Sequence, residues 1–313
     1  MIAVKIVIDK YIPFLQESLS GYDVTALSPE DINATTVRDA DALIVRTRTL
    51  VGRQLLEHSR VQFVATATIG TDHLDTTYLD GAGIKWYSSP GCNAQAVCDY
   101  TEEALDEWLP TTGKTSPTIG IIGVGHVGSL VKEMARRKGL RILLNDPPKG
   151  LSTPLRTIAK QADIITFHTP LQDDTFHLGN EEFFSLCRPG TLIINAARGG
   201  IVDEKALLRS HLPYIIDTWE GEPQLDMEVL HNAFRASFHI AGYSLQGKIN
   251  ATQQCLDALS EYFGTPPLAV DEKAVSLQQG SGDTRPCWLE RISTELKQYP
   301  DQFEQLRKQY KLR

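Results

Sequence analysis

The chain of 313 residues is long enough for two domains with separate cores, and its 42% hydrophobic and 22% charged residues are typical of a globular protein. Its net charge of −8 argues against a nucleic-acid or anionic-membrane partner, although local arginines could still bind a small anionic substrate. The five cysteines show no zinc-type pairing, the apolar amino terminus is too short for a signal peptide, and no run approaches membrane-spanning length. We therefore expect a cytoplasmic protein with buried free thiols and no metal site.

Short β-rich runs alternate with helix-like stretches in the first part of the chain, which predicts a parallel α/β fold. Strands are expected at 4–9, 42–46, 61–66 and 84–89. A helix is expected at 28–39, with Ser28 as its N-cap and Pro29 at its first position, and a longer helix at 93–108. Residues 109–117 contain two prolines and a glycine and are expected to form the crossing between domains.

A second strand–helix series begins near residue 118 and closes with a helix at about 244–263 that returns to the first domain. Its strands are expected at 118–122, 141–146, 162–168, 190–197 and 214–217. These runs are apolar throughout, as the central strands of a parallel sheet are.

Gly123, Gly125 and Gly128 have the G-x-G-x-x-G spacing, between a β-branched strand and an amphipathic helix. This order places backbone N–H groups where a pyrophosphate can bind. The next strand ends at Asp146, 18 residues after Gly128, where a carboxylate can accept the ribose hydroxyls and would repel a 2′-phosphate. A glycine-rich turn in another α/β protein is the alternative, but this context favours a Rossmann domain that prefers NAD to NADP. The loop holds two further candidate cofactor contacts, Val127 and His126, of which His126 could instead point to solvent.

Three polar residues follow candidate strands of this domain, although 41 residues separate the first, Arg198, from the last, His239. The carboxyl ends of the strands face the ligand crevice of such a sheet, so Arg198, Glu222 and His239 should converge there. Arginine can bind a substrate carboxylate, histidine can take a hydroxyl proton, and the glutamate can orient the ring. His239 could instead be a buried histidine bonded to the backbone, which is how we interpret His168 at the end of another strand.

At these residues the chain resembles the D-isomer-specific 2-hydroxyacid dehydrogenases. The motifs that carry the resemblance include "PGCNA" (90–94), "NDPP" (145–148), "NAARGGIVD" (195–203), "DTWEGEP" (217–223) and "HIAGYSLQGK" (239–248). The resemblance covers roughly residues 1–265 and implies the catalytic roles of Arg198, Glu222 and His239. The cofactor contacts expected from it are Asp146, Thr169, Ala197, Asp217 and Gly242. The expected substrate contacts are Thr47, Thr68 and Tyr243, and Arg46 is a candidate for binding a phosphate unless it is a solvated surface arginine.

The combination of "PGCNA", "DPP", "WEGEP" and "HIAGY" is more specific than the arginine–glutamate–histidine set. It implies NAD-dependent oxidation of 4-phospho-D-erythronate to 2-oxo-3-hydroxy-4-phosphobutanoate, a step of vitamin B6 biosynthesis. Two alternatives remain open. One is another D-2-hydroxyacid dehydrogenase, of the glyoxylate or hydroxypyruvate reductase type, and the other is a non-catalytic NAD-binding regulatory protein.

The fold class expected is α/β, with two Rossmann-like doubly wound parallel-sheet domains. An NAD-binding domain (94–242) would be inserted into a substrate domain (1–93 plus 243–269), followed by a short C-terminal segment (270–313) that resembles part of a dimerisation domain. The chain departs from the family at Phe238, where a proline is usual, and in the acidic helix at 94–108. We expect a homodimer with a small, salt-sensitive interface, in which the basic tail (306–313) lies against acidic surface.

Overall fold

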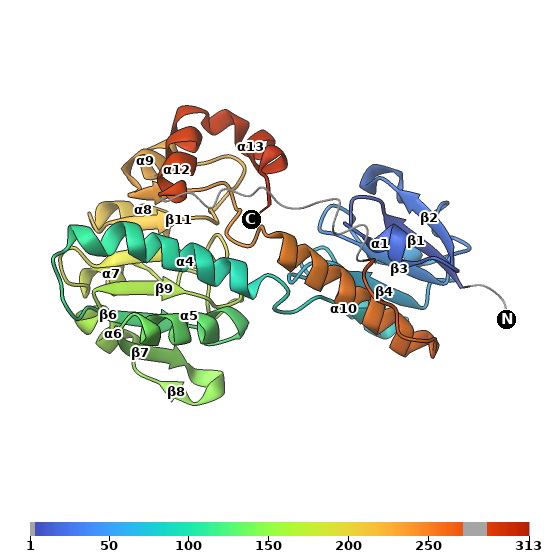
Figure 1. The fold of residues 1–313 in the computed structure, drawn as a ribbon, viewed down its shortest axis with the longest axis horizontal. Coiled ribbons are helices and arrows are strands. Elements are labelled where there is room, and N and C mark those ends of the chain that lie inside the picture. The colour runs from blue at the N-terminus through green and yellow to red at the C-terminus, as the bar shows by residue number, and fades with distance from the viewer. Residues whose placement is uncertain (1–3, 272–286, 313) are drawn as a thin grey trace. The chain divides into compact units, whose positions relative to one another are not determined.

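The structure, a computed structural model, describes residues 4–271 and 287–312, which form two compact α/β units (Figure 1). The first unit contains residues 4–93 and 244–271, and the second contains residues 94–243 and 287–312. Part of the expected C-terminal segment, residues 272–286, lies outside the described residues. Each unit has its own parallel sheet, so the predicted fold class is confirmed.

The first unit is built on a five-stranded parallel sheet in the order β2-β1-β3-β4-β5. Its strands are β1 (Lys5–Asp9), β2 (Asp23–Leu27), β3 (Ala42–Val45), β4 (Phe63–Thr66) and β5 (Lys85–Tyr87), and its helices are α1 (Leu15–Ser18), α2 (Arg53–Leu56), α3 (Thr76–Gly81) and α10 (Leu245–Phe263). Successive strand residues face opposite sides, so Ile6 and Ile8 pack with α10 while Val7 belongs to the core on the other face. The four predicted strands are confirmed. We did not predict β2, which is a half-exposed edge strand with little apolar signal.

The helix predicted at 28–39 is wrong, because only a short 3₁₀ turn, Pro29–Asp31, forms there. The Asn33 side chain accepts hydrogen bonds from the backbone N–H groups of Thr35 and Thr36 at 3.0 and 3.2 Å, and it donates to the Asp31 carbonyl oxygen at 3.0 Å. Such local side-chain bonds offer the backbone an alternative to the helix.

The second unit is built on a seven-stranded sheet in the order β12-β11-β10-β9-β6-β7-β8, parallel except for β8. The strands are β6 (Thr118–Ile122), β7 (Arg141–Asp146), β8 (Leu151–Ser152), β9 (Ile164–Phe167), β10 (Leu192–Asn195), β11 (Tyr214–Ile216) and β12 (Arg235–Ala236). The chain leaves β6 through β7 on one side and returns through β9 on the other. This reversal next to β6 is the switch point at which doubly wound sheets bind their ligands.

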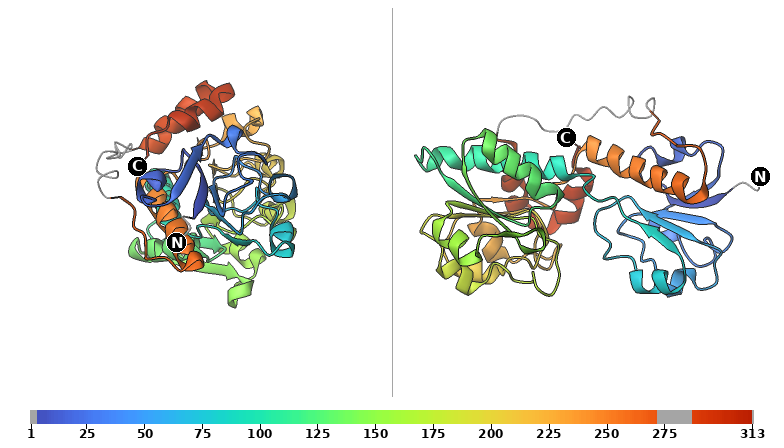
Figure 2. Two further views of the ribbon diagram at one scale, coloured as in Figure 1. Left: turned by 90° about the vertical axis from the view of Figure 1, so that its right-hand side faces the viewer. Right: turned by 90° about the horizontal axis from the view of Figure 1, so that it is seen from below.

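Helices cover both faces of this sheet (Figure 2). They are α4 (Ala94–Trp108), α5 (His126–Arg137), α6 (Leu155–Gln161), α7 (Glu181–Ser185), α8 (Glu204–Arg209), α9 (Met227–Asn232), α12 (Trp288–Gln298) and α13 (Phe303–Gln309). The helix predicted at 93–108 is confirmed, as α4. The crossing predicted at 109–117 is wrong, because that segment joins α4 to β6 within the second unit, and the chain passes between units at 93–94 and 243–244.

Three of the five carboxylates of α4 pair with basic residues of the second unit. Lys138 lies 3.2 Å from a carboxylate oxygen of Glu102 and 2.6 Å from one of Asp106, and Arg235 lies 2.6 Å from one of Glu107. These pairs supply the basic partners that a row of carboxylates needs when it is partly buried.

The start of α12 also binds this acidic face. The backbone N–H groups of Trp288 and Glu290 donate to the carboxylates of Glu103 and Glu107, each at 3.1 Å. Carboxylates at a helix N-terminus are favourable because the first N–H groups of a helix lack partners within the helix. Within this chain α12 therefore binds Glu103 and Glu107, and a contact of the basic tail with the acidic surface in a dimer stays a prediction.

The cysteines are all free thiols. Cys92, Cys98 and Cys255 are buried, as predicted, whereas Cys187 is partly buried and Cys287 is exposed. None of the helices in the described part of the chain is long and apolar enough to cross a membrane.

Candidate active site

The three predicted catalytic residues follow three neighbouring strands of the second unit. The strands β10, β11 and β12 are parallel, and their last residues are paired in register. Arg198, Glu222 and His239 come three, six and three residues after those strand ends. They therefore lie at one edge of the sheet, the carboxyl edge, although they are distant in sequence.

His239 and Glu222 form a hydrogen-bonded pair. The Nδ1 atom of His239 lies 2.5 Å from Oε1 of Glu222, and the two side chains are 28% and 24% exposed. The other carboxylate oxygen of Glu222 accepts the backbone N–H of Trp219 at 3.1 Å. Burial alone would raise the pKa of Glu222, but the bonds from His239 and Trp219 lower it below the ordinary glutamate value. The carboxylate thus orients the ring through Nδ1, an arrangement that would allow Nε2 to act as an acid–base group.

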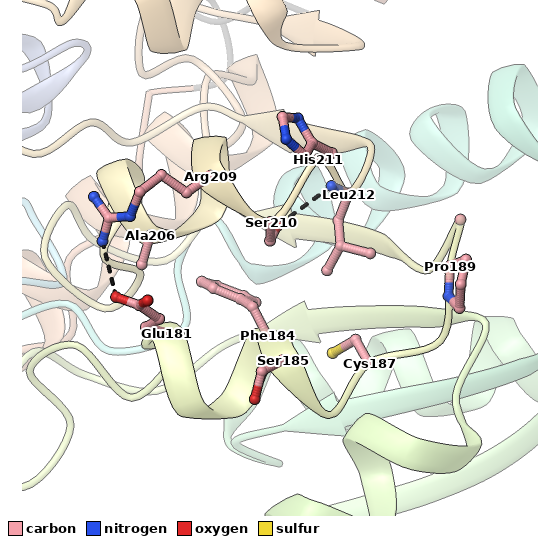
Figure 3. A pocket seen from close by; sticks show the side chains of 11 residues that line it. Glu181, Phe184, Ser185, Cys187, Pro189, Ala206, Arg209, Ser210, His211 and Leu212 are labelled. Atoms are coloured by element: carbon pink, nitrogen blue, oxygen red, sulfur yellow. Dashed lines mark hydrogen bonds and ion pairs between the residues drawn. The ribbon is translucent and has the colours of Figure 1, made fainter.

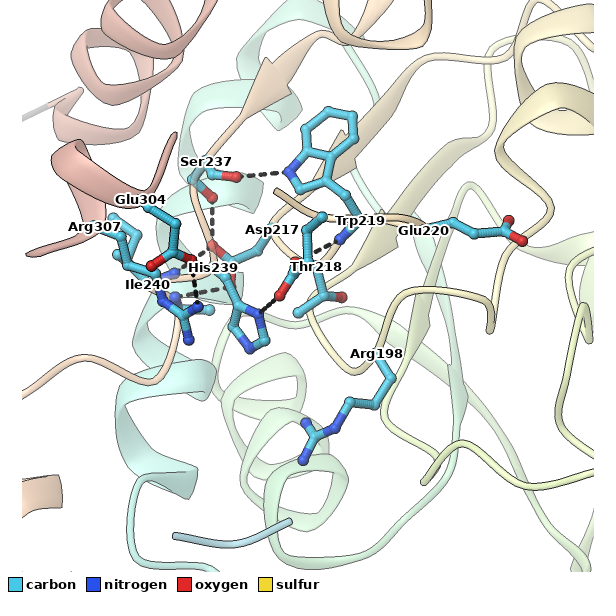
Figure 4. A network of polar contacts seen from close by, with 12 residues as sticks. Arg198, Asp217, Thr218, Trp219, Glu220, Ser237, His239, Ile240, Glu304 and Arg307 are labelled. Atoms are coloured by element: carbon cyan, nitrogen blue, oxygen red, sulfur yellow. Dashed lines mark hydrogen bonds and ion pairs between the residues drawn. The ribbon is translucent and has the colours of Figure 1, made fainter. Parts of the chain in front are cut away.

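The loop that carries His239 is held by the buried carboxylate of Asp217 (Figure 4). This carboxylate accepts hydrogen bonds from the Ser237 hydroxyl at 2.6 Å and from the backbone N–H groups of Ile240 and Ala241 at 2.8 and 2.9 Å. His239 has φ 58°, in the left-handed region, which costs a non-glycine residue about 1–2 kcal/mol. The surrounding bonds enforce this conformation. The contact of Asp217 with the cofactor stays a prediction, since its oxygens already hold the loop.

Arg198 stands on the loop after β10. Its Nη1 donates to the carbonyl oxygen of Ala197 at 2.8 Å, and its own carbonyl accepts the Asn195 side-chain amide at 3.0 Å. A Cβ on the following Gly199 would lie 2.0 Å from the Trp219 carbonyl oxygen, so only glycine allows the two loops to approach this closely. Figure 4 shows the Arg198 side chain reaching from this loop to the side of the sheet edge where His239 lies. The structure thus brings Glu222 and His239 into contact and places Arg198 on the neighbouring loop.

The glycine loop runs from β6 into α5 and forms a cradle in which three positions, Gly123, Gly125 and Gly128, carry no side chain. Gly123 has φ 85°, and a Cβ there would lie 2.7–2.8 Å from the backbone of His168 and Thr169. A Cβ on Gly128 would lie 2.0 Å from the Gly123 carbonyl oxygen, whereas one on Gly125 would meet no atom within 4 Å. Gly125 is the N-cap of α5 and gives it no side-chain cap. The loop thus presents open space and a helix N-terminus, both of which suit a pyrophosphate.

Two polar side chains complete this cradle. The Asp146 carboxylate, at the end of β7, accepts the backbone N–H of Val124 at 2.7 Å and so lies against the loop, where a ribose would be bound. The Thr169 hydroxyl is buried and has no hydrogen-bond partner among the described residues, which suits a contact with a bound cofactor. The same holds for Thr218, which our sequence analysis missed because a lone threonine gives no signal. The residues present therefore fit a dinucleotide.

His168, which we interpreted as structural, lies behind this cradle. Its Nε2 is 3.0 Å from the Thr166 hydroxyl, and burial lowers its pKa to about 4, so the ring is neutral at physiological pH.

The predicted substrate residues of the first unit follow β3 and β4. Thr47 is exposed, and the Thr68 hydroxyl donates to the carbonyl oxygen of Gly70 at 3.1 Å. Arg46 forms two hydrogen bonds, of 2.8 and 3.2 Å, with the fully buried Asp9 carboxylate. The Nε and Nη2 donors that a phosphate would need are thus already bonded to Asp9. If Arg46 turned to a phosphate, it would leave a buried charge unpaired.

Tyr243, the remaining predicted substrate contact, is bound by the C-terminal helix. Arg307 of α13 donates from Nε to the Tyr243 hydroxyl at 2.9 Å. Tyr310 packs edge-on against the buried Phe238, with ring centroids 6.0 Å apart, and 6.4 Å from Tyr243. Phe238, the residue that departs from the family, is thus part of the contact between the His239 loop and the tail. The sequence gives no signal for this role of Arg307, because the basic residues of a short terminal helix are usually solvated.

A separate hollow of about 430 Å³ lies on the opposite edge of the sheet (Figure 3). Its lining residues come from α7, from α8 and from the segments that lead into two strands. Pro189 lies in the segment before β10, and Leu212 lies in the segment before β11. Since those segments precede the strands, this hollow is at the amino edge and contains none of the predicted site residues.

Comparison with known proteins agrees with this geometry. Residues 97–240 match the family model described as "D-isomer specific 2-hydroxyacid dehydrogenase, NAD binding domain". The chain is 40% identical over 335 residues to the erythronate-4-phosphate dehydrogenase of Bacteroides fragilis, with 99% of this chain and 96% of that protein covered. It is 41% identical over 280 residues to the enzyme of the same name from Cronobacter sakazakii, covering 84% of this chain and 74% of that protein.

A solved structure shows the same fold. The NAD⁺-bound 3-phosphoglycerate dehydrogenase of Entamoeba histolytica matches with a TM-score of 0.71 and 24% identity, over 86% of this chain and 99% of that one.

Proposed function

The chain belongs to the D-isomer-specific 2-hydroxyacid dehydrogenases, as its motifs predicted, and we propose that it oxidises 4-phospho-D-erythronate with NAD⁺. The product would be 2-oxo-3-hydroxy-4-phosphobutanoate, and the reaction would serve pyridoxal 5′-phosphate biosynthesis. The main support for the proposal is the 2.5 Å contact between Nδ1 of His239 and Oε1 of Glu222, at the same sheet as the glycine cradle. The chain is also 40% identical to an erythronate-4-phosphate dehydrogenase.

The residues of the second unit would divide the chemistry as follows. When bound, NAD⁺ accepts the hydride that leaves C2 of the substrate. His239 takes the hydroxyl proton at Nε2, because Nδ1 is held by Glu222. The negative charge of Glu222 stabilises the imidazolium that results. Arg198 binds the substrate carboxylate through two N–H groups, which orients C2.

The cradle would hold the cofactor through Gly123, Gly125, Gly128, Asp146 and Thr169. The N–H groups at the start of α5 would face the pyrophosphate, and Asp146 would accept the ribose hydroxyls. Asp146 would also repel a 2′-phosphate, which favours NAD over NADP.

The two units would have separate roles. We assign NAD binding and the residues Arg198, Glu222 and His239 to the second unit, and we propose that the first unit adds substrate contacts through Thr47 and Thr68. We also propose a homodimer in the cytoplasm, in keeping with a small hydroxy-acid substrate and free thiols. Light scattering at low and high salt tests the dimer, since an interface dominated by charge pairs weakens as salt screens them.

A substrate panel followed by NADH absorbance tests the activity. It compares 4-phospho-D-erythronate with D-erythronate and D-glycerate, and in reverse it offers glyoxylate and hydroxypyruvate with NADH. We expect kcat/KM to be at least about 100-fold higher for the phosphorylated acid, because a site built for a charged group rejects analogues that lack it. Faster turnover of glyoxylate or hydroxypyruvate would favour a reductase of that type. NADH binding without turnover of any acid would favour a regulatory protein.

A further inference from the structure

We propose that Arg307 binds the substrate phosphate, so that the C-terminal helix α13 forms part of the active site. The inference rests on the proposed function, because it assumes a phosphorylated hydroxy acid. It assigns a substrate contact to the tail of the chain, which we had expected to serve only the dimer.

Arg307 extends to the loop that carries His239 (Figure 4). Arg307 and Tyr243 are 64 residues apart, yet the Arg307 Nε donates to the Tyr243 hydroxyl at 2.9 Å. Figure 4 shows the Arg307 side chain extending from α13 to the loop that carries His239. Burial alone would lower the pKa of Arg307, but Tyr243, Glu222 and Glu304 raise it, so the guanidinium lies within electrostatic reach of the catalytic carboxylate.

The phosphate of the proposed substrate is close to the reacting carbon. In 4-phospho-D-erythronate the phosphate-bearing carbon is two carbons from the carbon that loses hydride. A cation for the phosphate must therefore stand close to His239 without displacing Arg198, which is assigned to the carboxylate at the other end. Arg307 meets this requirement. Arg46 is less suitable, since both of its bonds go to the buried Asp9.

The Arg307 guanidinium has one short and one long hydrogen bond. The Arg307 side chain is 26% exposed, and Tyr243 fixes its orientation through Nε. The contact of its Nη1 with Glu304 is long, 3.5 Å, and Glu304 is itself partly exposed. A planar fork held at one end, with a weak bond at the other, can exchange that bond for the stronger charge-assisted bonds of a phosphate.

The test measures kcat and KM of full-length Arg307→Gln, with Lys308→Gln as the matched control because Lys308 is the neighbouring, exposed cation of α13. For Arg307→Gln we expect KM for 4-phospho-D-erythronate to rise about 10- to 100-fold, since charged hydrogen bonds are lost. KM and kcat for D-erythronate should stay within about twofold. Inorganic phosphate, used as a competitive inhibitor, should lose affinity in parallel, and Lys308→Gln should behave as wild type.

Arg307→Lys separates charge from packing, and thermal unfolding confirms that each variant is folded. The lysine variant keeps a cation without a fork, so its KM should lie between those of wild type and the glutamine variant. An unchanged KM for the phosphorylated acid in folded Arg307→Gln would overturn the inference and leave the proposed function standing. So would an equal loss of kcat with both acids, because that would make Arg307 a positioning residue for the His239 loop. Wild-type protein that fails to oxidise the phosphorylated acid would instead refute the proposed function.

Discussion

The glycine loop and the His239 loop follow strands of the same sheet, but the first leaves open space and the second is fixed by hydrogen bonds and packing. The glycine loop is open, since a Cβ on Gly125 would meet nothing and the Thr169 hydroxyl has no partner among the described residues. The His239 loop is closed by the bonds of Asp217 and by the packing of Phe238 against Tyr310. A binding site must leave bonds for its ligand to complete, whereas an acid–base group must be oriented before the substrate arrives.

The largest effect should come from the closed loop. His239→Asn removes the proton acceptor, and we expect kcat to fall about 10²–10⁴-fold while the Kd of NADH stays unchanged. Stopped-flow turnover and fluorescence titration of NADH measure the two quantities.

His177 offers a matched control for this change. Its Nε2 lies 3.1 Å from a carboxylate oxygen of Glu220, and its φ is also positive, at 48°. His177→Asn should lower kcat far less than His239→Asn, because His177 comes ten residues after the end of β9 and is bonded to Glu220 instead of Glu222. Normal turnover by His239→Asn would show that His239 is structural.

Substitutions in the glycine loop should weaken NADH binding and leave the chemical step unchanged. Gly128→Ala would place a Cβ 2.0 Å from the Gly123 carbonyl oxygen, and we expect NADH to bind about 10- to 100-fold more weakly, with a lower Tm. The Cβ of Gly125→Ala would meet no protein atom within 4 Å, so Tm should not fall. The Cβ would instead occupy the open space assigned to the pyrophosphate, so NADH should bind more weakly. Calorimetric titration and thermal unfolding separate the two variants. Gly81→Ala, where a Cβ would also meet nothing, is the neutral control, and full NADH affinity in Gly128→Ala would contradict the cradle.

Glu222→Gln sharpens the comparison inside the closed loop. We expect kcat to fall about tenfold at neutral pH, because the imidazolium loses its stabilising charge. The pKa of Glu222 is lowered in the folded protein, so its contribution to the free energy of unfolding is present above the ordinary glutamate pKa. This stabilisation is lost as the pH falls through the lowered pKa of Glu222. The free energy of unfolding of the glutamine variant should therefore decrease less towards acid pH than that of the wild type. Urea unfolding across the acid range measures it. Identical pH dependence in both proteins would argue against an ionised Glu222.

The smallest effect should be on the choice of cofactor. Asp146→Ala removes the carboxylate that would repel a 2′-phosphate, and we expect the preference for NAD over NADP to narrow severalfold to tenfold. Lys149 follows β7 and its Nζ lies 2.7 Å from the Val124 carbonyl oxygen, so a cation stands beside the glycine loop. The ratio of kcat/KM with the two cofactors measures the change. Equal use of both cofactors by the wild type would refute the role of Asp146.

Local sequence determined the parts of this protein that depend on neighbouring residues. Five of the seven strands of the second unit, α4 and the glycine loop follow from apolar runs and glycine spacing, whereas β8 and β12, of two residues each, were not predicted. The predicted catalytic residues were chosen from their positions after strands. Where a local pattern failed, as at 28–39, the reason was also local: the Asn33 side chain competed for the backbone bonds.

Only the tertiary structure decided which polar groups are partnered. Asp217 and Arg46 look available in the sequence, but the fold gives them Ser237 and Asp9 as partners. Likewise, no spacing rule predicts that Arg307 meets Tyr243, or that Tyr310 packs against the phenylalanine next to His239. The last two contacts join residues more than sixty positions apart in the sequence. They form because of how the C-terminal helix packs at the sheet, and packing and hydrogen-bond satisfaction depend on the whole core.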